Sequence, residues 1–407
     1  MKSVHSALIA TLVSSVCIVG LPVAADQDVT RGVETLGPIG AHTVWVPDRL
    51  FAHSRLYDGD TGGVLAIVDS AGKLTPTPPM HAPTRNEIYS VDVDYSRGRR
   101  GDRIDYVTIL DATTLRVTGE VLLPNPTAES NTSIAHTALL DGERFLLTYT
   151  QFPETVVTIV DLESRTIAGV VPIAGCAGIY PAGPSRFATL CGDGTTTLVV
   201  LDENGAHLRT ERSEVFFDVV EDPVAMAGAR LGDDWVFISF AGQVHRINYA
   251  GERPVTALPW PLADPNERAA GWRPGGLQHV TIHSESNTLF VVMHEGQAGS
   301  HKDAGPEIWR FDLTSGARLG RFETSNLTAD LFGQMAGLEP GGWADWLLHL
   351  VLDTPGVHSI AVTQDESPVL FARNAELGIV AVLDPETGDL LRNLEEAGIT
   401  GPTLGVR

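Results

Sequence analysis

The sequence predicts an all-β protein folded as a seven-bladed β-propeller, and three observations carry this prediction. A short apolar strand that ends in Asp or Asn and runs into a turn recurs seven times, a second apolar strand precedes most of these repeats, and helical periodicity is rare. Four-stranded propeller blades repeat with a period in the forties. The spacings here are 42, 50, 41, 46, 64 and 72 residues, between Asp69, Asp111, Asp161, Asp202, Asn248, Asp312 and Asp384.

Each repeat has the same order of residue types, as "VTILDATTL" (107–115) and "VTIVDLESR" (157–165) illustrate. The Asp or Asn side chain accepts a hydrogen bond from the backbone two residues further on, and small or polar residues complete the turn. Upstream lies another strand, such as "RFLLTYT" (144–150). The alternative, a β-sandwich with a second domain, explains the sevenfold recurrence less well.

The ring of blades has to close, because an unpaired blade edge is a template for pairing with other chains. The segment between Asp28 and Gly40 precedes the first full pair of strands. We expect this segment to add an outer strand to the last blade.

The first 25 residues have the pattern of a signal peptide. Lys2 precedes an apolar run from Ala7 to Leu21, and the small residues that follow suit cleavage near Ala25, which leaves 26–407 as the propeller. The run is shorter than the roughly 20 residues of a membrane-spanning helix, so we expect a periplasmic or secreted protein without membrane insertion. The net charge of −23 argues against nucleic acid and anionic membranes as partners.

Cleavage would leave two cysteines, Cys176 and Cys191. In an oxidising compartment such a pair predicts a disulfide, and two free buried thiols are the alternative. Two cysteines are too few for a four-thiolate metal centre.

An insertion at 324–356 interrupts the strand pattern. Within it, an apolar stripe with helical spacing predicts a short helix, which either packs on the propeller rim or docks a partner. The stripe consists of Trp343, Trp346, Leu347, Leu350 and Val351.

Candidate chemical residues are few. His279 and His283 alternate on a strand, but no third metal ligand is apparent, so we predict no metal site and hydrogen-bonded histidines instead. The nearest acidic cluster is Glu87, Asp92 and Asp94, and its aspartates are interpreted mainly as turn formers. The basic run "SRGRRGDR" (96–103) is either a solvated hairpin or a subunit contact.

Several segments, in order along most of the chain, resemble the heavy subunit of quinoprotein amine dehydrogenases of the methylamine dehydrogenase type. They are "PTRNEIYSVDVDYSRGRRGDRIDYVTILDATTL" (83–115), "GCAGIYPAGPSRFATLCGDGT" (175–195), "GWRPGGLQHVTIHSESNTLFVV" (271–292) and "VHSIAVTQDESPVLFARNAELGIVAVLDPETGDLL" (357–391).

The resemblance implies a periplasmic α2β2 heterotetramer. A propeller heavy chain without catalytic residues or cofactor supports a small cysteine-rich light subunit that carries tryptophan tryptophylquinone. Primary amines are oxidised to aldehyde and ammonia, and a copper protein or cytochrome accepts the electrons. The competing hypotheses are an exported propeller that binds a partner without redox chemistry and a stand-alone propeller hydrolase.

The resemblance also suggests roles for three residues. Phe51 best matches a phenylalanine that the family's heavy chain contributes to the amine channel. In "GWRPGG" (271–276), the glycines supply backbone freedom and leave Trp272 and Arg273 to project. The two side chains are expected either at the light-subunit interface, with Trp272 supplying buried area and Arg273 a bidentate contact, or covering the blade edge.

Overall fold

The computed structural model describes residues 35–407 except 71–72, 74, 99, 130–132, 328, 331–332, 334–335, 340–341, 352–355, 395–396, 399–400, 402 and 407, with backbone only for 345 and 349–351. Thr35–Arg407 forms one compact unit and is described by itself. The predicted signal peptide and its cleavage site lie outside the described residues.

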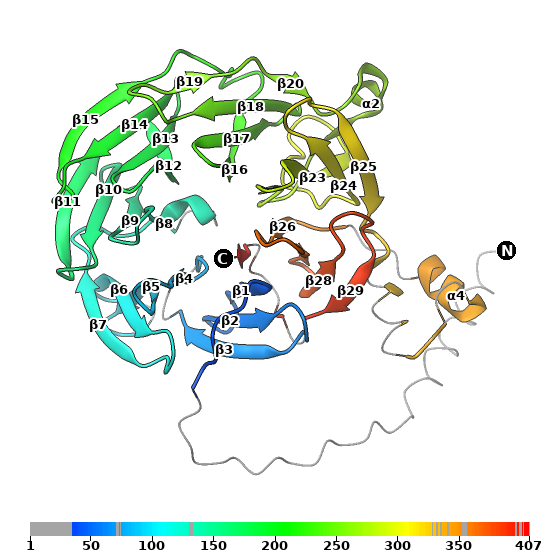
Figure 1. The fold of residues 1–407 in the computed structure, drawn as a ribbon, viewed down its shortest axis with the longest axis horizontal. Helices are drawn as coiled ribbons and strands as arrows, with labels where there is room; N and C mark the ends of the chain where they lie inside the picture. Colours follow the sequence, from blue (N-terminus) through cyan, green and yellow to red (C-terminus); the bar gives the residue numbers. More distant parts are fainter. Residues whose placement is uncertain are drawn as a thin grey trace, which may run out of the picture. The chain divides into compact units, whose positions relative to one another are not determined.

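Seven antiparallel sheets are arranged as blades around a central axis, which confirms the predicted seven-bladed β-propeller (Figure 1). From the axis outward, blade 1 contains β30 (Gly405–Val406), β1 (Thr43–Asp48), β2 (His53–Asp58) and β3 (Val64–Asp69). Blade 2 contains β4 (Met80–Ala82), β5 (Glu87–Tyr95), β6 (Arg103–Asp111) and β7 (Val117–Leu122). Blade 3 contains β8 (Thr137–Leu139), β9 (Phe145–Thr150), β10 (Val156–Asp161) and β11 (Thr166–Pro172).

The other four blades follow in the same order around the ring. Blade 4 contains β12 (Cys176–Pro181), β13 (Arg186–Cys191), β14 (Thr196–Leu201) and β15 (His207–Arg212). Blade 5 contains β16 (Val224–Leu231), β17 (Asp234–Ser239), β18 (Gln243–Asn248), β19 (Val255–Thr256) and β20 (Trp260–Pro261). Blade 6 contains β21 (Trp272–Pro274), β22 (Val280–His283), β23 (Thr288–Glu295), β24 (Glu307–Asp312) and β25 (Arg318–Glu323). Blade 7 contains β26 (Ser359–Val362), β27 (Leu370–Asn374), β28 (Ile379–Leu383) and β29 (Leu390–Asn393).

The short helices lie outside the blades. The 3-10 helix η1 (Ile134–His136) leads into β8, α2 (Pro265–Ala270) leads into blade 6, and α4 (Trp343–Val351) lies in the insertion. None of the helices in the described part of the chain has the length and apolar character that crossing a membrane requires.

The core lies between neighbouring blades. Strands β9 and β10 are buried along their whole length because each sheet packs against a blade on either side. The outer strand β15 is half-exposed and carries charged side chains. Apolar contacts between successive blades therefore hold the ring together.

The predicted turns form as expected at six of the seven repeats. In blade 2, the Asp111 carboxylate accepts hydrogen bonds from the backbone N–H groups of Thr113 (3.1 Å) and Thr114 (2.7 Å). The prediction was wrong for Asp69, which ends the outer strand β3. The equivalent residue is Asp58, whose carboxylate accepts from the N–H of Asp60 at 2.8 Å. The sequence of β3 is more apolar than that of β2 and so resembles the repeat more closely. The predicted repeat was therefore placed one strand too late in blade 1.

The predicted closure was also wrong. The outer strand of blade 7 is β29, whereas the ring closes in blade 1, where β30 from the C-terminus pairs with β1 as its innermost strand. The described part of the predicted segment lies elsewhere, because the Leu36 N–H donates to the Thr113 carbonyl of blade 2 at 2.7 Å. The C-terminal strand β30 takes the innermost position of blade 1. The strands β1, β2 and β3 therefore occupy the second, third and fourth positions of that blade.

The stretch "GGLQH" (275–279) divides the inner strand of blade 6 and bulges toward blade 7. The N–H of Leu277 donates to the His358 carbonyl (2.8 Å), and the N–H of Ile360 donates to the Gln278 carbonyl (2.9 Å). The buried Gln278 amide also bonds both backbone groups of Leu404: it donates to the carbonyl at 3.0 Å and accepts from the N–H at 2.9 Å. One side chain thus joins blades 6 and 7 to the closing strand.

The helix predicted in the insertion is confirmed as α4. The described side chains of its apolar stripe do not pack on the rim: Trp343 is 82% exposed, Trp346 is 63% exposed, and Leu347 is also exposed. The side chains of Leu350 and Val351 lie outside the described set.

Candidate functional site

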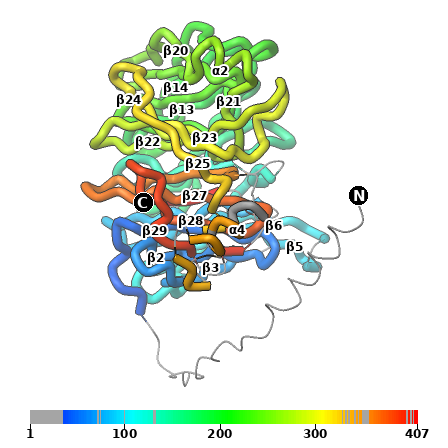
Figure 2. The backbone as a smooth tube through the Cα atoms, turned by 90° about the vertical axis from the view of Figure 1, so that its right-hand side faces the viewer, coloured from blue at the N-terminus to red at the C-terminus, as the bar shows by residue number. Residues whose placement is uncertain are grey.

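The two ends of the propeller differ in which connections they carry. The links between blades and the turns between second and third strands lie at one end, here called the link face. The turns after the third-strand Asp or Asn residues lie at the other, the aspartate face. In the side view of Figure 2, β21 and the β5–β6 hairpin lie toward one end and β22 toward the other.

A cavity of about 760 Å³ occupies the centre of the ring and is lined by residues from all seven blades. Its walls are mainly apolar, as Trp45, Leu139 and Ile282 illustrate. Arg230 reaches the rim, but its guanidinium donates two 2.6 Å bonds to the Asp141 carboxylate. The cavity therefore offers apolar contacts and a guanidinium that is already paired.

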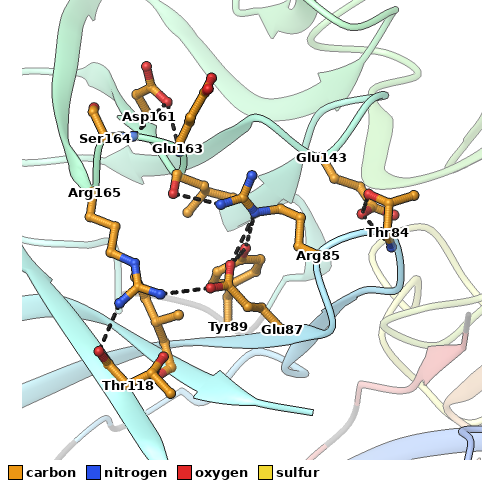
Figure 3. Close-up of polar contacts among 12 residues, drawn as sticks. Thr84, Arg85, Glu87, Tyr89, Thr118, Glu143, Asp161, Glu163, Ser164 and Arg165 are labelled. Atoms are coloured by element: carbon orange, nitrogen blue, oxygen red, sulfur yellow. Dashed lines mark hydrogen bonds and ion pairs between the residues drawn. The ribbon is translucent and has the colours of Figure 1, made fainter.

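Glu87 ties blades 2 and 3 together on the aspartate face (Figure 3). Its carboxylate accepts hydrogen bonds from Arg165 (2.8 Å), Arg85 (3.1 Å) and the Tyr89 hydroxyl. Burial alone would raise the pKa of Glu87, but these donors lower it below its usual value. Arg85 and Arg165 also donate to the carbonyls of Leu162 and Thr118. All three of these hydrogen bonds to the Glu87 carboxylate are structural contacts.

The two neighbouring aspartates, Asp92 and Asp94, differ in how far they are buried. Asp94 is exposed and accepts from the Tyr106 hydroxyl at 2.8 Å. Asp92 is buried and accepts from Ser90 (2.9 Å) and Thr108 (2.6 Å). They do not form a pair with a shared role.

Asp92 has a buried cationic neighbour that sequence reasoning missed. Lys73 is 3% exposed, and among the described residues its ammonium donates one hydrogen bond, to the Thr77 hydroxyl at 3.4 Å. Burial lowers the pKa of Lys73 to about 8 and raises that of Asp92 to about 6, while their mutual attraction opposes both changes. A lone lysine beside "TPTPP" carried no sequence signal for burial.

Of the two predicted histidines, His283 is hydrogen-bonded and His279 is buried. The His283 ring bonds the Ser286 hydroxyl at 2.8 Å and the Asp365 carbonyl at 3.0 Å. His279 is buried, and burial together with His301 lowers its pKa to about 4. No group of three or more His, Cys, Asp or Glu residues in the described part of the chain is arranged to hold a metal ion.

Cys176 and Cys191 form the predicted disulfide, with their Cα atoms 3.9 Å apart. They are directly opposite each other in the β12–β13 pair, at the link face of blade 4. The alternative of two free thiols is excluded.

The three residues singled out by resemblance all lie at the link face. Phe51 is 65% exposed in the turn between β1 and β2. Trp272 is half-buried, with its ring centroid 5.2 Å from that of Trp309, and Arg273 is half-buried beside it. The structure thus places all three at the same end of the ring, and their roles stay predictions. It also shows Gln278, whose role the neighbouring glycines alone did not reveal.

Residues 41–330 match the methylamine dehydrogenase heavy chain (MADH) family. The methylamine dehydrogenase heavy chain of Methylorubrum extorquens is 26% identical over 377 residues, covering 90% of this chain and 83% of the relative. That of Paracoccus versutus is 26% identical over 353 residues, covering 85% of this chain and 74% of the relative.

Solved structures with similar folds share little sequence. A functionally unknown protein from Desulfotomaculum acetoxidans has a TM-score of 0.54 at 13% identity, covering 90% of this chain and 98% of its own. A dihydro-heme d1 dehydrogenase has a TM-score of 0.51 at 15% identity, covering 91% of this chain and 77% of its own. These two similarities concern the fold alone. The family match spans most of the propeller, and the chain belongs to the methylamine dehydrogenase heavy chain family.

Proposed function

We propose that this chain is the heavy subunit of a periplasmic, tryptophan tryptophylquinone-dependent amine dehydrogenase with α2β2 composition. A primary amine and water are converted to an aldehyde and ammonia with release of two protons, and two electrons pass to a copper protein or cytochrome. This chain scaffolds the light subunit and shapes the entry path of the amine. The observation that carries the proposal is the family match over 41–330.

Tryptophan tryptophylquinone, held in the light subunit, would supply the electrophilic carbonyl and accept the electrons. Such a group requires two cross-linked tryptophans, and the Trp272–Trp309 pair of this chain serves packing instead. Trp309 is fully buried, and its indole N–H donates to the Glu307 carboxylate at 2.6 Å. Trp272 packs against its ring. This supports placing the quinone in the partner.

Phe51 is the residue of this chain proposed to contact the amine path. Its ring stands on an exposed turn of the link face, where a docked subunit would cover it. Covering an exposed aromatic ring removes water from the path and limits the size of the amine that passes. Trp272 and Arg273 lie at the same end and are proposed to contact the light subunit.

The test is a pull-down of the tagged chain from its native periplasm, followed by amine-dependent dye reduction. We expect a small subunit with quinone absorbance to co-purify and the complex to reduce dye when a primary amine is added. A lone chain without a small partner would contradict the proposal. A partner without amine-dependent reduction would favour a binding module.

A further inference from the structure

The central cavity adjoins an apolar space between the blades, here called the recess. The recess has a volume of about 220 Å³ and is lined by residues of blades 2 to 5. It shares part of its lining with the cavity of about 760 Å³, including Met80, Leu139 and Trp235. Figure 1 shows the inner strands β4, β8, β12 and β16 of these blades around the axis. Small-molecule sites in proteins have volumes of about 300–1,000 Å³, so the central cavity has the size of a ligand site.

The cavity reaches solvent at the aspartate face. Its lining includes three exposed residues at the turns between the first and second strands of blades 5, 6 and 7, namely Gly232, Ser284 and Gln364. The up-and-down course of the strands places these turns at the same end as the turns after the third strands. The mouth is therefore opposite the end that carries Phe51 and Trp272, so a subunit docked at the link face would leave the mouth open.

The lining offers no charge that a ligand could use. Among the described residues that line the cavity and the recess, none is acidic, and Arg230 is the one with a permanently charged side chain. Its guanidinium is already bonded to the Asp141 carboxylate and donates to the Gly232 carbonyl at 2.8 Å. An ionised ligand would lose hydration here without gaining an opposite charge, and the net charge of −23 opposes an anion further.

The polar groups of the recess are bonded to the protein itself. The Tyr180 hydroxyl donates to the Met226 carbonyl at 2.8 Å, and the Trp235 indole N–H donates to the Pro181 carbonyl at 2.7 Å. A buried water molecule needs about two to four polar partners. The walls of the recess therefore favour an apolar ligand over water.

The same walls favour an aromatic ring. Trp235 is half-buried and presents a flat ring to both the cavity and the recess. Met80 and Met226 are also half-buried, and their thioethers adapt to irregular shapes and make favourable contacts with aromatic rings. An apolar protein cavity of about 150 Å³ is large enough to bind benzene. The recess is larger than this and can hold one aromatic ring system.

We propose that the central cavity is a binding site for an uncharged aromatic molecule, which enters from the aspartate face and places its ring in the recess beside Trp235. Substituents of the ring extend into the wider cavity. There the Thr281 hydroxyl, which accepts from the Val362 N–H at 3.3 Å, has its proton to donate to the ligand. The inference goes beyond the proposed function and does not depend on it, because no residue of this site is assigned to the amine path or to the subunit contact.

The test is equilibrium binding of the neutral fluorescent probe N-phenyl-1-naphthylamine to the full chain, purified with any subunit that it retains. Saturable binding to the wild type is expected. Leu139→Trp fills the recess, and Met80→Gln adds a polar group of similar size to its wall, so each should weaken binding about tenfold or more. The matched controls are Leu208→Trp, on an outer strand where Leu208 is 63% exposed, and Trp343→Ser, on the exposed helix α4. Both controls should bind the probe as the wild type does.

The predicted charge selectivity is tested by competition. Naphthalenemethanol, naphthoate and naphthylmethyl-trimethylammonium share a ring system and differ in charge, and the neutral compound should displace the probe at about tenfold lower concentration than either ion. Equal displacement by all three would show that the proposed ligand chemistry is wrong.

Three further results would overturn the site itself. They are no saturable binding to the wild type, wild-type binding by both Leu139→Trp and Met80→Gln, and loss of binding in Trp343→Ser, which would place the probe on α4. None of these results affects recovery of a light subunit, which tests the proposed function separately.

Discussion

The aspartate face repeats one solution, whereas each part of the link face is different. On the aspartate face, Asp58, Asp111 and Asp161 each accept hydrogen bonds from the backbone of the turn that follows. The link face carries the disulfide, the long β5–β6 hairpin, exposed aromatic tips and both ends of the insertion. Repetition serves the architecture, and the divergent face is where a partner can be distinguished. Single substitutions should therefore have larger effects in the link-face half of the molecule.

The largest effect is expected from Gly276→Ala, in the link-face half of blade 6. Gly276 has φ +105°, and an added Cβ would lie 2.4 Å from the His358 carbonyl oxygen of blade 7. We expect a loss of at least about 3 kcal/mol in the free energy of unfolding, measured by urea denaturation. Gly299→Ala is the control, because Gly299 has φ +95° with nothing within 4 Å, and about 1 kcal/mol is expected. Equal losses of stability in the two variants would show that the contact between Gly276 and His358 of blade 7 does not cause the effect.

A second comparison uses two glutamines that join blades 6 and 7 at different depths. Gln278→Leu leaves the backbone N–H and carbonyl of Leu404 unpaired in a buried place, which should cost about 2–3 kcal/mol. Gln364 also bonds blade 6, through the Ile282 carbonyl (2.8 Å) and the Ser284 N–H (3.1 Å), but it is exposed on the aspartate face.

Gln364→Leu should therefore cost less than about 1 kcal/mol, because water can replace the lost bonds. Hydrogen exchange at 403–406 provides the second measurement. Faster exchange in Gln278→Leu alone would locate the weakness at the closing strand, whereas unchanged exchange would refute this role of Gln278.

The pH dependence of stability should have opposite signs at the two ends. His279, in the link-face half, stays neutral in the folded state because burial and His301 lower its pKa from 6.5 to about 4. Its contribution is present above pH 6.5 and is lost as the pH falls to about 4, an effect of about 3 kcal/mol. His279→Gln should flatten this acid limb in stability measurements against pH.

On the aspartate face, His42 joins blade 1 to blade 7 through Asp60 (2.8 Å) and Asp365 (2.9 Å). Burial alone would lower the pKa of His42, but the bonds to these carboxylates raise it above 6.5. Its contribution is fully present below pH 6.5 and is lost as the pH rises through the folded-state pKa. His42→Gln should remove this decline on the alkaline side. If the same limb flattens in both variants, the assignment to two ends is wrong.

Apart from the control substitutions, the smallest effect is expected at a single turn of the aspartate face. Asp161→Ala removes the acceptor for the Glu163 N–H (2.9 Å) and for Arg144 (2.9 Å) in blade 3. Asp161 itself is buried, but Glu163 and Ser164 of the turn are exposed to water, so a loss of about 1 kcal/mol is expected from the shift in thermal midpoint. A loss as large as that of Gly276→Ala would show that the repeated turns are not interchangeable.

The turns were the most predictable part of the fold, because an Asx turn is made by residues two or three apart. Asp111 and Asp161 behave as their local sequence indicates. The error at Asp69 arose where blade 1 is assembled from both ends of the chain, so that the strand order differs from that of the other blades. Local pattern does not report which end supplies the innermost strand.

The candidate site was less predictable for a related reason. Lys73 lies in the link between β3 and β4, and Asp92 lies in strand β5. Both side chains are buried only once the blades pack against one another. The glycine-rich loop before Gln278 was recognised from its sequence, whereas the bonds of Gln278 to Leu404 join residues 126 apart. Side chains whose partners are distant in sequence carry no local signal.

By itself, the sequence determined the blade number, the turn chemistry, the cysteine pair and the family resemblance, because each rests on residues near one another or on the order of motifs. Only the tertiary structure decided how the ring closes and why Gly276 must lack a Cβ, because both depend on contacts between blades. It also decided which end carries Phe51, Trp272 and the β5–β6 hairpin, because the up-and-down course of the strands assigns each turn to a face.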